Sequence, residues 1–197
     1  MNTGLGESGL DLSVILPTRG RSVLLARALR RLASQSLGRD RYEVLVGLDG
    51  PDEESEHAAA WVAAATGAPI RVVPCARLGI AGVKNELLRR ARGRSVLFIN
   101  DDIIPERGFL EAHVAAQAEA LTRTGGAMAL GDSRFVPGAP DSAMDRLVRE
   151  TSMVFFYDRM DASGQRDDRW HDWGFRHAWN LNLSAPREAV LAVGGFT

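Results

Sequence analysis

Short apolar runs alternate with amphipathic stretches along the first two thirds of the chain. Helical spacing of apolar positions predicts helices over residues 22–35, 52–65, 81–91 and 106–121. Runs rich in branched residues predict the strands Leu12–Leu16, Glu43–Leu48, Ile70–Val73 and Ser95–Ile99. Strands separated by helices of this length form right-handed βαβ units, so the pattern predicts an α/β fold, Rossmann-like, with a mainly parallel central sheet covered on both faces.

The alternation ends in the last third of the chain. Residues 127–130 predict one more strand, and an amphipathic stretch follows over residues 142–153. Ser22 is expected to cap the first helix, and Gly67 to end the second. No internal repeat interrupts the 197 residues, so we expect a single folding unit.

Composition narrows the classes of partner. The chain has 24 basic and 25 acidic residues, which gives a net charge of -1 and does not favour nucleic acid. A single cysteine, Cys75, cannot form an internal disulfide and suits a reducing compartment. No signal peptide and no apolar run of membrane-spanning length is present in the sequence. We expect a cytoplasmic protein without a transmembrane segment, and leave open a peripheral position at the inner face of a membrane.

Polar residues follow each predicted strand at the point where it ends. Ligands of parallel α/β sheets bind beyond the carboxyl ends of the strands, so these residues are the first candidates for a site. They combine cationic groups suited to a diphosphate with carboxylates suited to a divalent cation or to ribose hydroxyls. The group comprises Thr18, Arg19, Gly20 and Arg21, then Asp49, residues 77–85, and finally Asn100, Asp101 and Asp102.

The segment Asn100-Asp101-Asp102 carries the most specific chemistry. Adjacent carboxylates after an apolar strand suit Mg²⁺ or Mn²⁺, held by one or two carboxylates together with phosphate oxygens and water. The alternative is a solvated loop in which an aspartate caps the following helix.

The other candidates also have a structural alternative. Asp49 is either a turn residue before Gly50 or an acceptor for the base or ribose. Lys84 and Asn85, early in a helix, either meet phosphate charge or are a surface lysine beside a capping asparagine. Arg19 and Arg21 either face the diphosphate or belong to a solvated turn. Of the aromatic residues 170–179, Trp179 and Trp173 either stack on an acceptor sugar or pack into the core.

Taken in order, these pieces resemble family 2 glycosyltransferases of the GT-A fold over nearly the whole chain. The resemblance rests on residues 12–18, 43–50, 79–85, 97–102 and 182–196, the last including Gly194-Gly195-Phe196. It implies one GT-A domain over 1–197, a three-layer α/β/α structure. Residues 1–124 would form its nucleotide-sugar-binding half, and residues 125–197 the start of an acceptor-side half that is incomplete at its C-terminus.

The resemblance also implies roles for individual residues. Pro17, Thr18 and Asp49 match positions around the nucleotide base, and Lys84 stands where an arginine is usual, near base and diphosphate. Asp102 takes the metal-binding last position of the DxD motif, with Asn100 at its first position and Asp101 towards the ribose. Asn182 and Arg187 match the segment that borders donor sugar and acceptor. These assignments complete the predicted set: nucleotide-sugar binding by Pro17, Thr18, Arg19, Arg21, Asp49, Lys84, Asn85 and Asp101, metal binding by Asp102 and Asn100, and acceptor contacts by Trp179, Asn182 and Arg187.

The sequence departs from the family pattern at three points. Leu48 replaces a carboxylate before Asp49-Gly50, and the uncharged Asn100 replaces the first aspartate of the DxD motif. The acidic segment that supplies the catalytic base in the family is expected beyond Thr197, so the base is unassigned and the chain is expected to bind donor but to transfer sugar poorly.

The resemblance predicts inverting, metal-assisted transfer of sugar from a nucleoside-diphosphate sugar to an unknown acceptor: a saccharide, a lipid or a small molecule. The cofactor would be Mn²⁺ or Mg²⁺, and the setting cell-envelope or polysaccharide biosynthesis. Two alternatives are a noncatalytic nucleotide-sugar-binding domain and a sugar-phosphate nucleotidyltransferase. The second requires a Gly-rich basic loop after the first strand, and residues 18–21 are too short for one.

Overall fold

A computed structural model describes residues 9–133, 142–150, 157–165, 168, 170–174 and 177–197. The chain divides into two compact units, Met1–Gly131 with Asn180–Thr197, and Asp132–Trp179. The first unit contains β1 (Leu12–Thr18), α1 (Ser22–Ala33), β2 (Tyr42–Asp49), α2 (Glu53–Thr66), β3 (Ile70–Cys75), α3 (Gly79–Arg90), β4 (Ser95–Ile99), α4 (Phe109–Thr124), β5 (Ala129–Leu130), β6 (Asn182–Pro186) and α7 (Arg187–Ala192). The second contains α5 (Ala143–Glu150) and α6 (Tyr157–Ala162).

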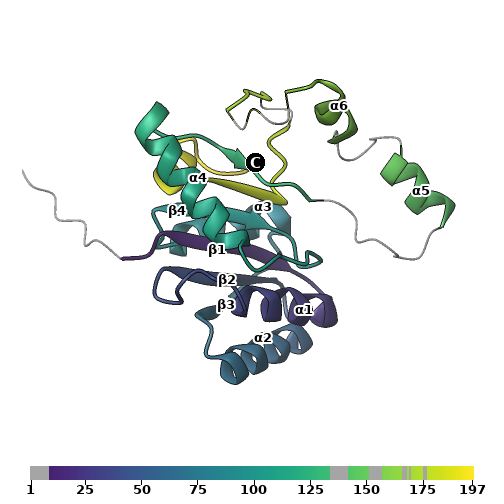
Figure 1. Cartoon of the computed structure of the whole chain (residues 1–197). Helices are drawn as coiled ribbons and strands as arrows, with labels where there is room; N and C mark the ends of the chain where they lie inside the picture. The colour runs from purple at the N-terminus through teal and green to yellow at the C-terminus, as the bar shows by residue number, and fades with distance from the viewer. Residues whose placement is uncertain (1–8, 134–141, 151–156, 166–167, 169, 175–176) are drawn as a thin grey trace, which may run out of the picture. The chain divides into compact units, whose positions relative to one another are not determined.

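The strands of the first unit form one sheet in the order β3-β2-β1-β4-β6-β5 (Figure 1). Strands β1 to β4 are mutually parallel, whereas β6 is antiparallel to both β4 and β5. The predicted α/β fold with a mainly parallel sheet is confirmed. Because the order reverses between β1 and β4, their carboxyl ends form the switch point at which open α/β sheets bind ligands.

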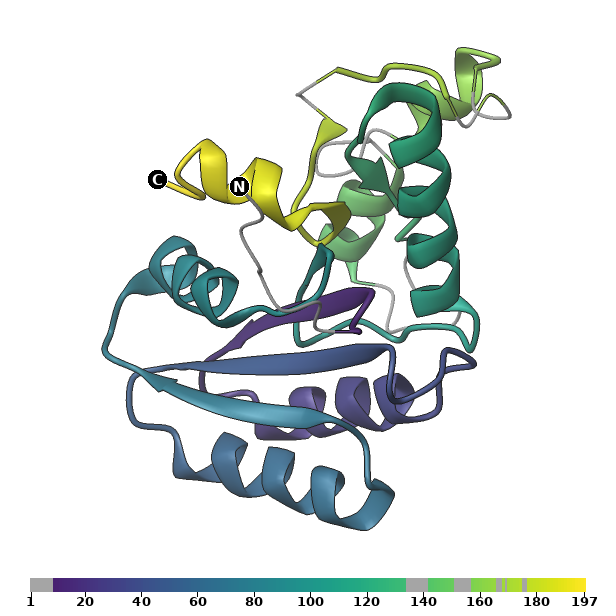
Figure 2. The same ribbon diagram turned by 90° about the vertical axis from the view of Figure 1, so that its left-hand side faces the viewer.

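Helices cover both faces of this sheet, which gives the three layers. Alternate strand residues point to opposite faces. One face packs Val14, Val46 and Leu97 against helices α1, α2 and α4. The other packs Ile15 and Phe98 against helices α3 and α7. In Figure 2, α1 and α2 lie side by side beneath the sheet.

The helix ends differ in part from the predictions. Gly67 ends α2 in the left-handed conformation, as predicted. Ser22 does not cap α1: the cap position is Arg21, without a side-chain bond, and the Ser22 hydroxyl instead donates to Glu54. The helix predicted from residue 106 begins at Phe109, after a turn. Strand β3 extends two residues beyond the predicted Val73 and ends at Cys75, which is half-buried.

Among the described helices, none combines the length and the apolar composition needed to cross a membrane.

Candidate nucleotide-sugar site

Three side chains join the ends of β1 and β4 in one hydrogen-bonded cluster. The Thr18 hydroxyl donates to Oδ2 of Asp101 at 2.6 Å, and Nη1 of Arg21 donates to Oδ1 at 2.8 Å. The Asp101 side chain is only 5% exposed, whereas that of Arg21 is 50% exposed. The hydrogen bond to Asp101 raises the pKa of the Arg21 guanidinium. A charged carboxylate is thus held in a fixed orientation at the switch point.

Asp102 offers a second carboxylate beside this cluster. Its Oδ2 lies 3.3 Å from Nη1 of Arg21, and its side chain is 45% exposed, in contrast to that of Asp101. Helix α1 supports the same loop, because Nη2 of Arg27 lies 3.5 Å from the Asp102 carbonyl oxygen. Asn100, half-buried, directly precedes this pair of carboxylates.

Asp49, at the end of β2, fixes the loop that leads into α3. Its Oδ1 accepts hydrogen bonds from the backbone amides of Leu78 and Gly79, at 2.8 and 3.1 Å. Its Oδ2 lies 3.9 Å from Nη1 of Arg19. Asp49 is therefore more than a turn residue: one oxygen organises the start of α3, and the other faces the cationic loop after β1.

Asp52 holds that cationic loop from the other side. Its Oδ2 accepts a 2.6 Å hydrogen bond from the Gly20 amide, and its Oδ1 caps α2 by accepting from the Ser55 amide. Burial alone would raise the pKa of this carboxyl, but the hydrogen bonds from Gly20 and Ser55 lower it. Asp52 thereby stabilises the backbone that carries Arg19 and Arg21.

Lys84, on α3, is buried without a carboxylate partner among the described residues. Its Nζ donates to the backbone oxygen and to Oδ1 of Asn180, at 3.1 and 2.6 Å, and lies 5.6 Å from the centre of the Phe196 ring. Burial lowers the pKa of Lys84 to about 8. A positive charge in this position lacks a counter-anion, which a phosphate group can supply.

Asn85 binds the C-terminal segment. Its Nδ2 donates to the Phe196 carbonyl oxygen at 2.7 Å, and its Oδ1 accepts from the Phe196 amide at 2.8 Å. Gly195 has a φ of +79°, and a Cβ there would lie 2.2 Å from Oδ1 of Asn85. The Gly-Gly-Phe sequence is therefore explained by its packing on α3, where the Phe196 ring also contacts Phe98 edge to face.

This arrangement of residues matches a known family. The profile described as glycosyl transferase family 2 matches residues 13–180, most of the chain. The chain belongs to glycosyl transferase family 2. Comparison with curated proteins gave no match.

Solved structures show the same GT-A fold. A mannosyltransferase from Pyrobaculum calidifontis, PcManGT, solved with GDP-Man and Mn²⁺, superposes with a TM-score of 0.65 at 19% identity. That match covers 94% of this chain and 47% of the other. TarS 1–349 from S. aureus with UDP-GlcNAc gives a TM-score of 0.54 at 21% identity, over 68% of this chain and 37% of the other. The chain thus spans less than half the length of these structures.

Asn182 lies at the same edge of the sheet as Asp101 and Asp102. It pairs with Ile99 at the start of β6, directly before the loop of Asp101 and Asp102. Its Oδ1 is 2.8 Å from Nε2 of His113, a buried residue of α4. A Cβ on Gly131 would lie 2.3 Å from Nδ2 of Asn182, so the absence of a side chain at Gly131 makes room for this amide.

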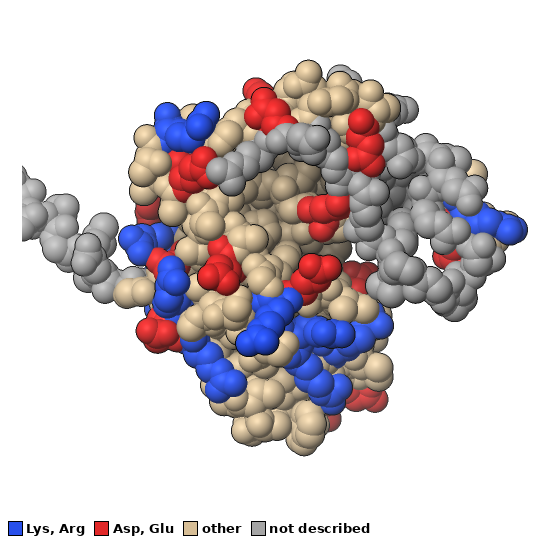
Figure 3. Space-filling view, in the orientation of Figure 1, with Lys and Arg blue, Asp and Glu red and all other residues tan. Residues whose placement is uncertain are grey.

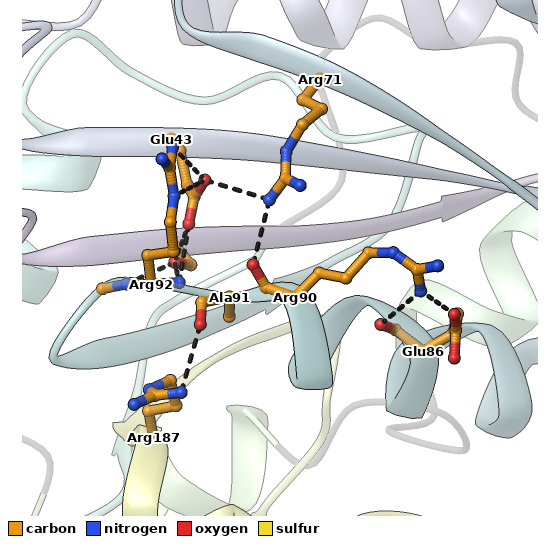
Figure 4. A network of polar contacts seen from close by, with 9 residues as sticks. Glu43, Arg71, Glu86, Arg90, Ala91, Arg92 and Arg187 are labelled. Atoms are coloured by element: carbon orange, nitrogen blue, oxygen red, sulfur yellow. Dashed lines mark hydrogen bonds and ion pairs between the residues drawn. The ribbon is translucent and has the colours of Figure 1, made fainter. Parts of the chain in front are cut away.

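Arg187 lies at the opposite edge. Because β6 is antiparallel, its last residue Pro186 pairs with Ser95, at the beginning of β4. Arg187 follows and donates to the carbonyl oxygen of Ala91 at 3.2 Å, as Figure 4 shows. The structure therefore separates Arg187 from the other predicted site residues.

The same edge holds a buried carboxylate, Glu43 (Figure 4). It accepts hydrogen bonds from the Ser13 hydroxyl at 2.8 Å and from the Arg92 backbone amide at 2.8 Å and guanidinium at 2.9 and 3.1 Å, with Arg71 at 3.4 Å. Burial would raise the pKa of Glu43, but these partners hold it below the usual range. This network is structural, because it lies at the strand ends remote from the site.

Trp179 belongs to the second unit. Its ring centre lies 5.9 Å from that of His177, which in turn lies 5.7 Å from that of Trp173. Both tryptophans are half-buried, and neither belongs to the two cores of buried residues. The stacking of Trp179 on an acceptor sugar therefore stays a prediction.

The first unit brings most of the predicted residues to one edge: Pro17, Thr18, Arg19, Arg21, Asp49, Asn100, Asp101, Asp102 and Asn182 lie at or next to the strand ends there. Sequence reasoning missed the supporting residues Asp52, His113 and Asn180. Of these, Asp52 had a detectable signal, since an aspartate three residues before Ser55 is a typical helix cap.

Proposed function

We propose that this domain binds a nucleoside-diphosphate sugar at the ends of β1, β2 and β4, and that it transfers the sugar to an acceptor hydroxyl with inversion. The observation that carries the proposal is the joining of Thr18, Arg21 and Asp101 at the switch point, with Asp102 beside them. Membership of the family supports glycosyl transfer. PcManGT and TarS were solved with GDP-Man and UDP-GlcNAc, which supports a donor of this class.

Asp101 is proposed to accept hydrogen bonds from the ribose. Its orientation is fixed by Thr18 and Arg21, and each carboxylate oxygen can accept more than one hydrogen bond. Asp49 is proposed to contact the base through Oδ2, since its Oδ1 is taken by Leu78 and Gly79. Arg19 and Arg21 then lie on the loop that faces the diphosphate.

A divalent cation fits this site when phosphate oxygens complete its coordination. Among the described residues, no group of three His, Cys, Asp or Glu side chains could hold a metal ion. The exposed Asp102 carboxylate and the Asn100 carbonyl oxygen are the oxygen ligands that Mn²⁺ or Mg²⁺ would use, as both ions commonly bind few carboxylates together with phosphate. When bound, the cation neutralises charge that develops on the departing diphosphate.

Asn182, beside the Asp101 loop, is proposed to border the donor sugar. The acceptor proton requires a base, which a carboxylate commonly provides. The residue that acts as this base is unassigned.

Isothermal titration calorimetry on this chain tests the proposal. We expect one of UDP, GDP and dTDP, or its sugar, to bind more tightly in Mn²⁺ than in EDTA, and Asp102→Asn to remove that difference. An absence of binding by every nucleotide in both conditions would overturn the proposal.

A noncatalytic role as a nucleotide-sugar-binding domain is the second candidate, favoured by two departures from the family pattern. Leu48 is buried at 2% exposure where the family has a carboxylate, and Asn100 removes a further charge. Donor binding, donor hydrolysis and sugar transfer, measured on this chain, separate the two. Binding without turnover identifies a binding domain.

A further inference from the structure

The outer face of α1 is strongly cationic. Arg27, Arg30 and Arg31 fall at positions i, i+3 and i+4, so they share one side of the helix, and all three are exposed. The helix contains no acidic residue. Figure 3 shows Lys and Arg side chains gathered over α1, although the chain as a whole is nearly neutral.

Large apolar side chains are exposed beside these arginines. Trp61, on the adjacent helix α2, is 59% exposed, and Val23, one turn before Arg27, is 80% exposed. The Arg30 guanidinium lies over the Trp61 ring, 5.1 Å from its centre. We call Val23, Arg27, Arg30, Arg31 and Trp61 the Arg–Trp surface. It combines positive charge with an exposed aromatic ring.

Within the described part of the chain, these arginines have no carboxylate partner. Arg27 contacts a backbone oxygen, that of Asp102, and Arg30 contacts an aromatic ring. Two acidic side chains near the ends of α1 are bound to serines, Glu54 to Ser22 and Glu111 to Ser36. The positive charge of the surface is thus uncompensated by ion pairs.

Helix α3 provides a contrast. It also has two arginines in its last turn, Arg89 and Arg90, but both form ion pairs with Glu86. The last turn of α1 has Arg30 and Arg31, and neither forms an ion pair with a residue that the structure describes. A favourable interaction with the helix C-terminus explains a basic last turn in either helix. It does not explain why the charges on α1 are left unpaired beside an exposed tryptophan.

We propose that the Arg–Trp surface docks on an anionic lipid bilayer. Arginine is attracted to the negative surface potential of such a bilayer, and tryptophan partitions into its headgroup region, where an apolar ring and a polar N–H are both accommodated. The exposed ring and Val23 favour lipid over a soluble polyanion, which would bind the arginines alone. Arg27 links the surface to the Asp102 loop, so the bilayer would border the nucleotide-sugar site. The proposal does not depend on sugar transfer.

Cosedimentation with vesicles tests the proposal on the intact chain. Phosphatidylcholine vesicles with and without phosphatidylglycerol are the probes. We expect binding to the anionic vesicles, and a decrease of roughly thirtyfold in the partition coefficient for the double variant Arg30→Gln/Arg31→Gln. The matched control Arg89→Gln/Arg90→Gln removes the same charge from α3 and should leave the partition coefficient unchanged. Equal losses in the two double variants, or equal binding to both kinds of vesicle, would overturn the proposal.

Trp61→Ala separates lipid from other anions. Folding of each variant is verified by circular dichroism. If the Trp61 ring contacts lipid, Trp61→Ala should weaken vesicle binding severalfold. Leu121→Ala, at an exposed leucine of α4, is the control and should leave vesicle binding unchanged. Full binding by Trp61→Ala, together with tight binding of soluble polyphosphate by the unmodified chain, would instead assign the surface to a soluble polyanion and refute the lipid proposal.

Discussion

The Thr18 hydroxyl donates a 2.6 Å hydrogen bond to the Asp101 carboxylate, from a position 83 residues earlier in the sequence. Both residues are buried, with 4% exposure each. The bond joins the ends of β1 and β4 at the switch point, and it fixes a carboxylate at that edge of the sheet. The orientation of the Asp101 side chain therefore depends on Thr18 of β1 as well as on β4, the strand that Asp101 follows.

Removal of this hydrogen bond should weaken nucleotide binding. Thr18→Val preserves shape but leaves one oxygen of the buried carboxylate without its donor, at a cost of about 1 to 3 kcal/mol. We expect part of this loss in the free energy of unfolding and part in affinity for the nucleotide, measured by urea titration and calorimetry. Thr18→Ser, which retains the hydroxyl, is the control. Full affinity in Thr18→Val would show that Asp101 is held adequately by Arg21.

Substitution of Arg21 should change the affinity for Mn²⁺, as substitution of Asp102 should. Arg21 contacts Oδ2 of Asp102 at 3.3 Å and therefore competes with a cation for that carboxylate. Arg21→Gln should tighten Mn²⁺ binding in the presence of a nucleoside diphosphate, whereas Asp102→Asn should weaken it. Electron paramagnetic resonance of free Mn²⁺ measures both. Weaker Mn²⁺ binding by Arg21→Gln would contradict the competition.

Much of this site follows from the sequence because the logic of βαβ units is local. Once β1, β2 and β4 are recognised from their apolar runs, Thr18, Asp49 and Asp101 must share an edge of the sheet, since parallel strands end together. Family resemblance adds roles to positions that pattern alone leaves open.

Long-range pairing could not be predicted in the same way. Nothing in the local pattern shows that β6 runs antiparallel, yet that direction places Asn182 at the site and Arg187 at the opposite edge. Likewise Lys84 donates a hydrogen bond to Asn180, 96 residues away, and Asn85 donates one to the backbone of Phe196. Such contacts depend on the path of the chain through the second unit, which local propensity does not determine.

Asp49 should act both through its charge and through its hydrogen bonds. Asp49→Asn retains an acceptor for the Leu78 and Gly79 amides but removes the charge beside Arg19, whereas Asp49→Ala removes both. We expect Asp49→Ala to lose about 1 to 3 kcal/mol of binding free energy, and also to lower the melting temperature. Asp49→Asn should keep the melting temperature and lose affinity only. If both variants bind as the unmodified chain does, Asp49 has no role beyond the loop.

The Glu43 network should give the fold an acid-sensitive component. The folded-state pKa of Glu43 is lowered from its ordinary value of 4.5, so its stabilisation is present above that value and is lost as pH falls through the folded pKa. We expect Glu43→Gln to cost about 1 to 3 kcal/mol at pH 7 and to flatten the decline in stability below pH 4.5. Urea unfolding from pH 3 to pH 7 measures this. A parallel decline in variant and unmodified protein would assign acid sensitivity to other carboxylates.

Lys84 provides a test of phosphate contact that does not rely on activity. Its pKa of about 8 means that roughly half of the molecules carry a neutral amine at pH 8 before the nucleotide binds. A diphosphate placed near Nζ favours the charged form and raises that pKa, so binding at pH 8 should take up as much as about half a proton. Affinity should be constant below pH 8 and fall above it.

Calorimetry in Tris and in HEPES, which differ in ionisation enthalpy, measures the uptake, and a nucleotide sugar serves as ligand because its diphosphate does not titrate near pH 8. Lys84→Arg is the matched variant, since a guanidinium stays charged throughout this range. It should bind without proton uptake and without the loss of affinity above pH 8. Identical binding enthalpies in the two buffers for the unmodified chain would show that Lys84 keeps its hydrogen bonds to Asn180 and does not contact the diphosphate. Its role would then be to hold the segment before β6 against α3.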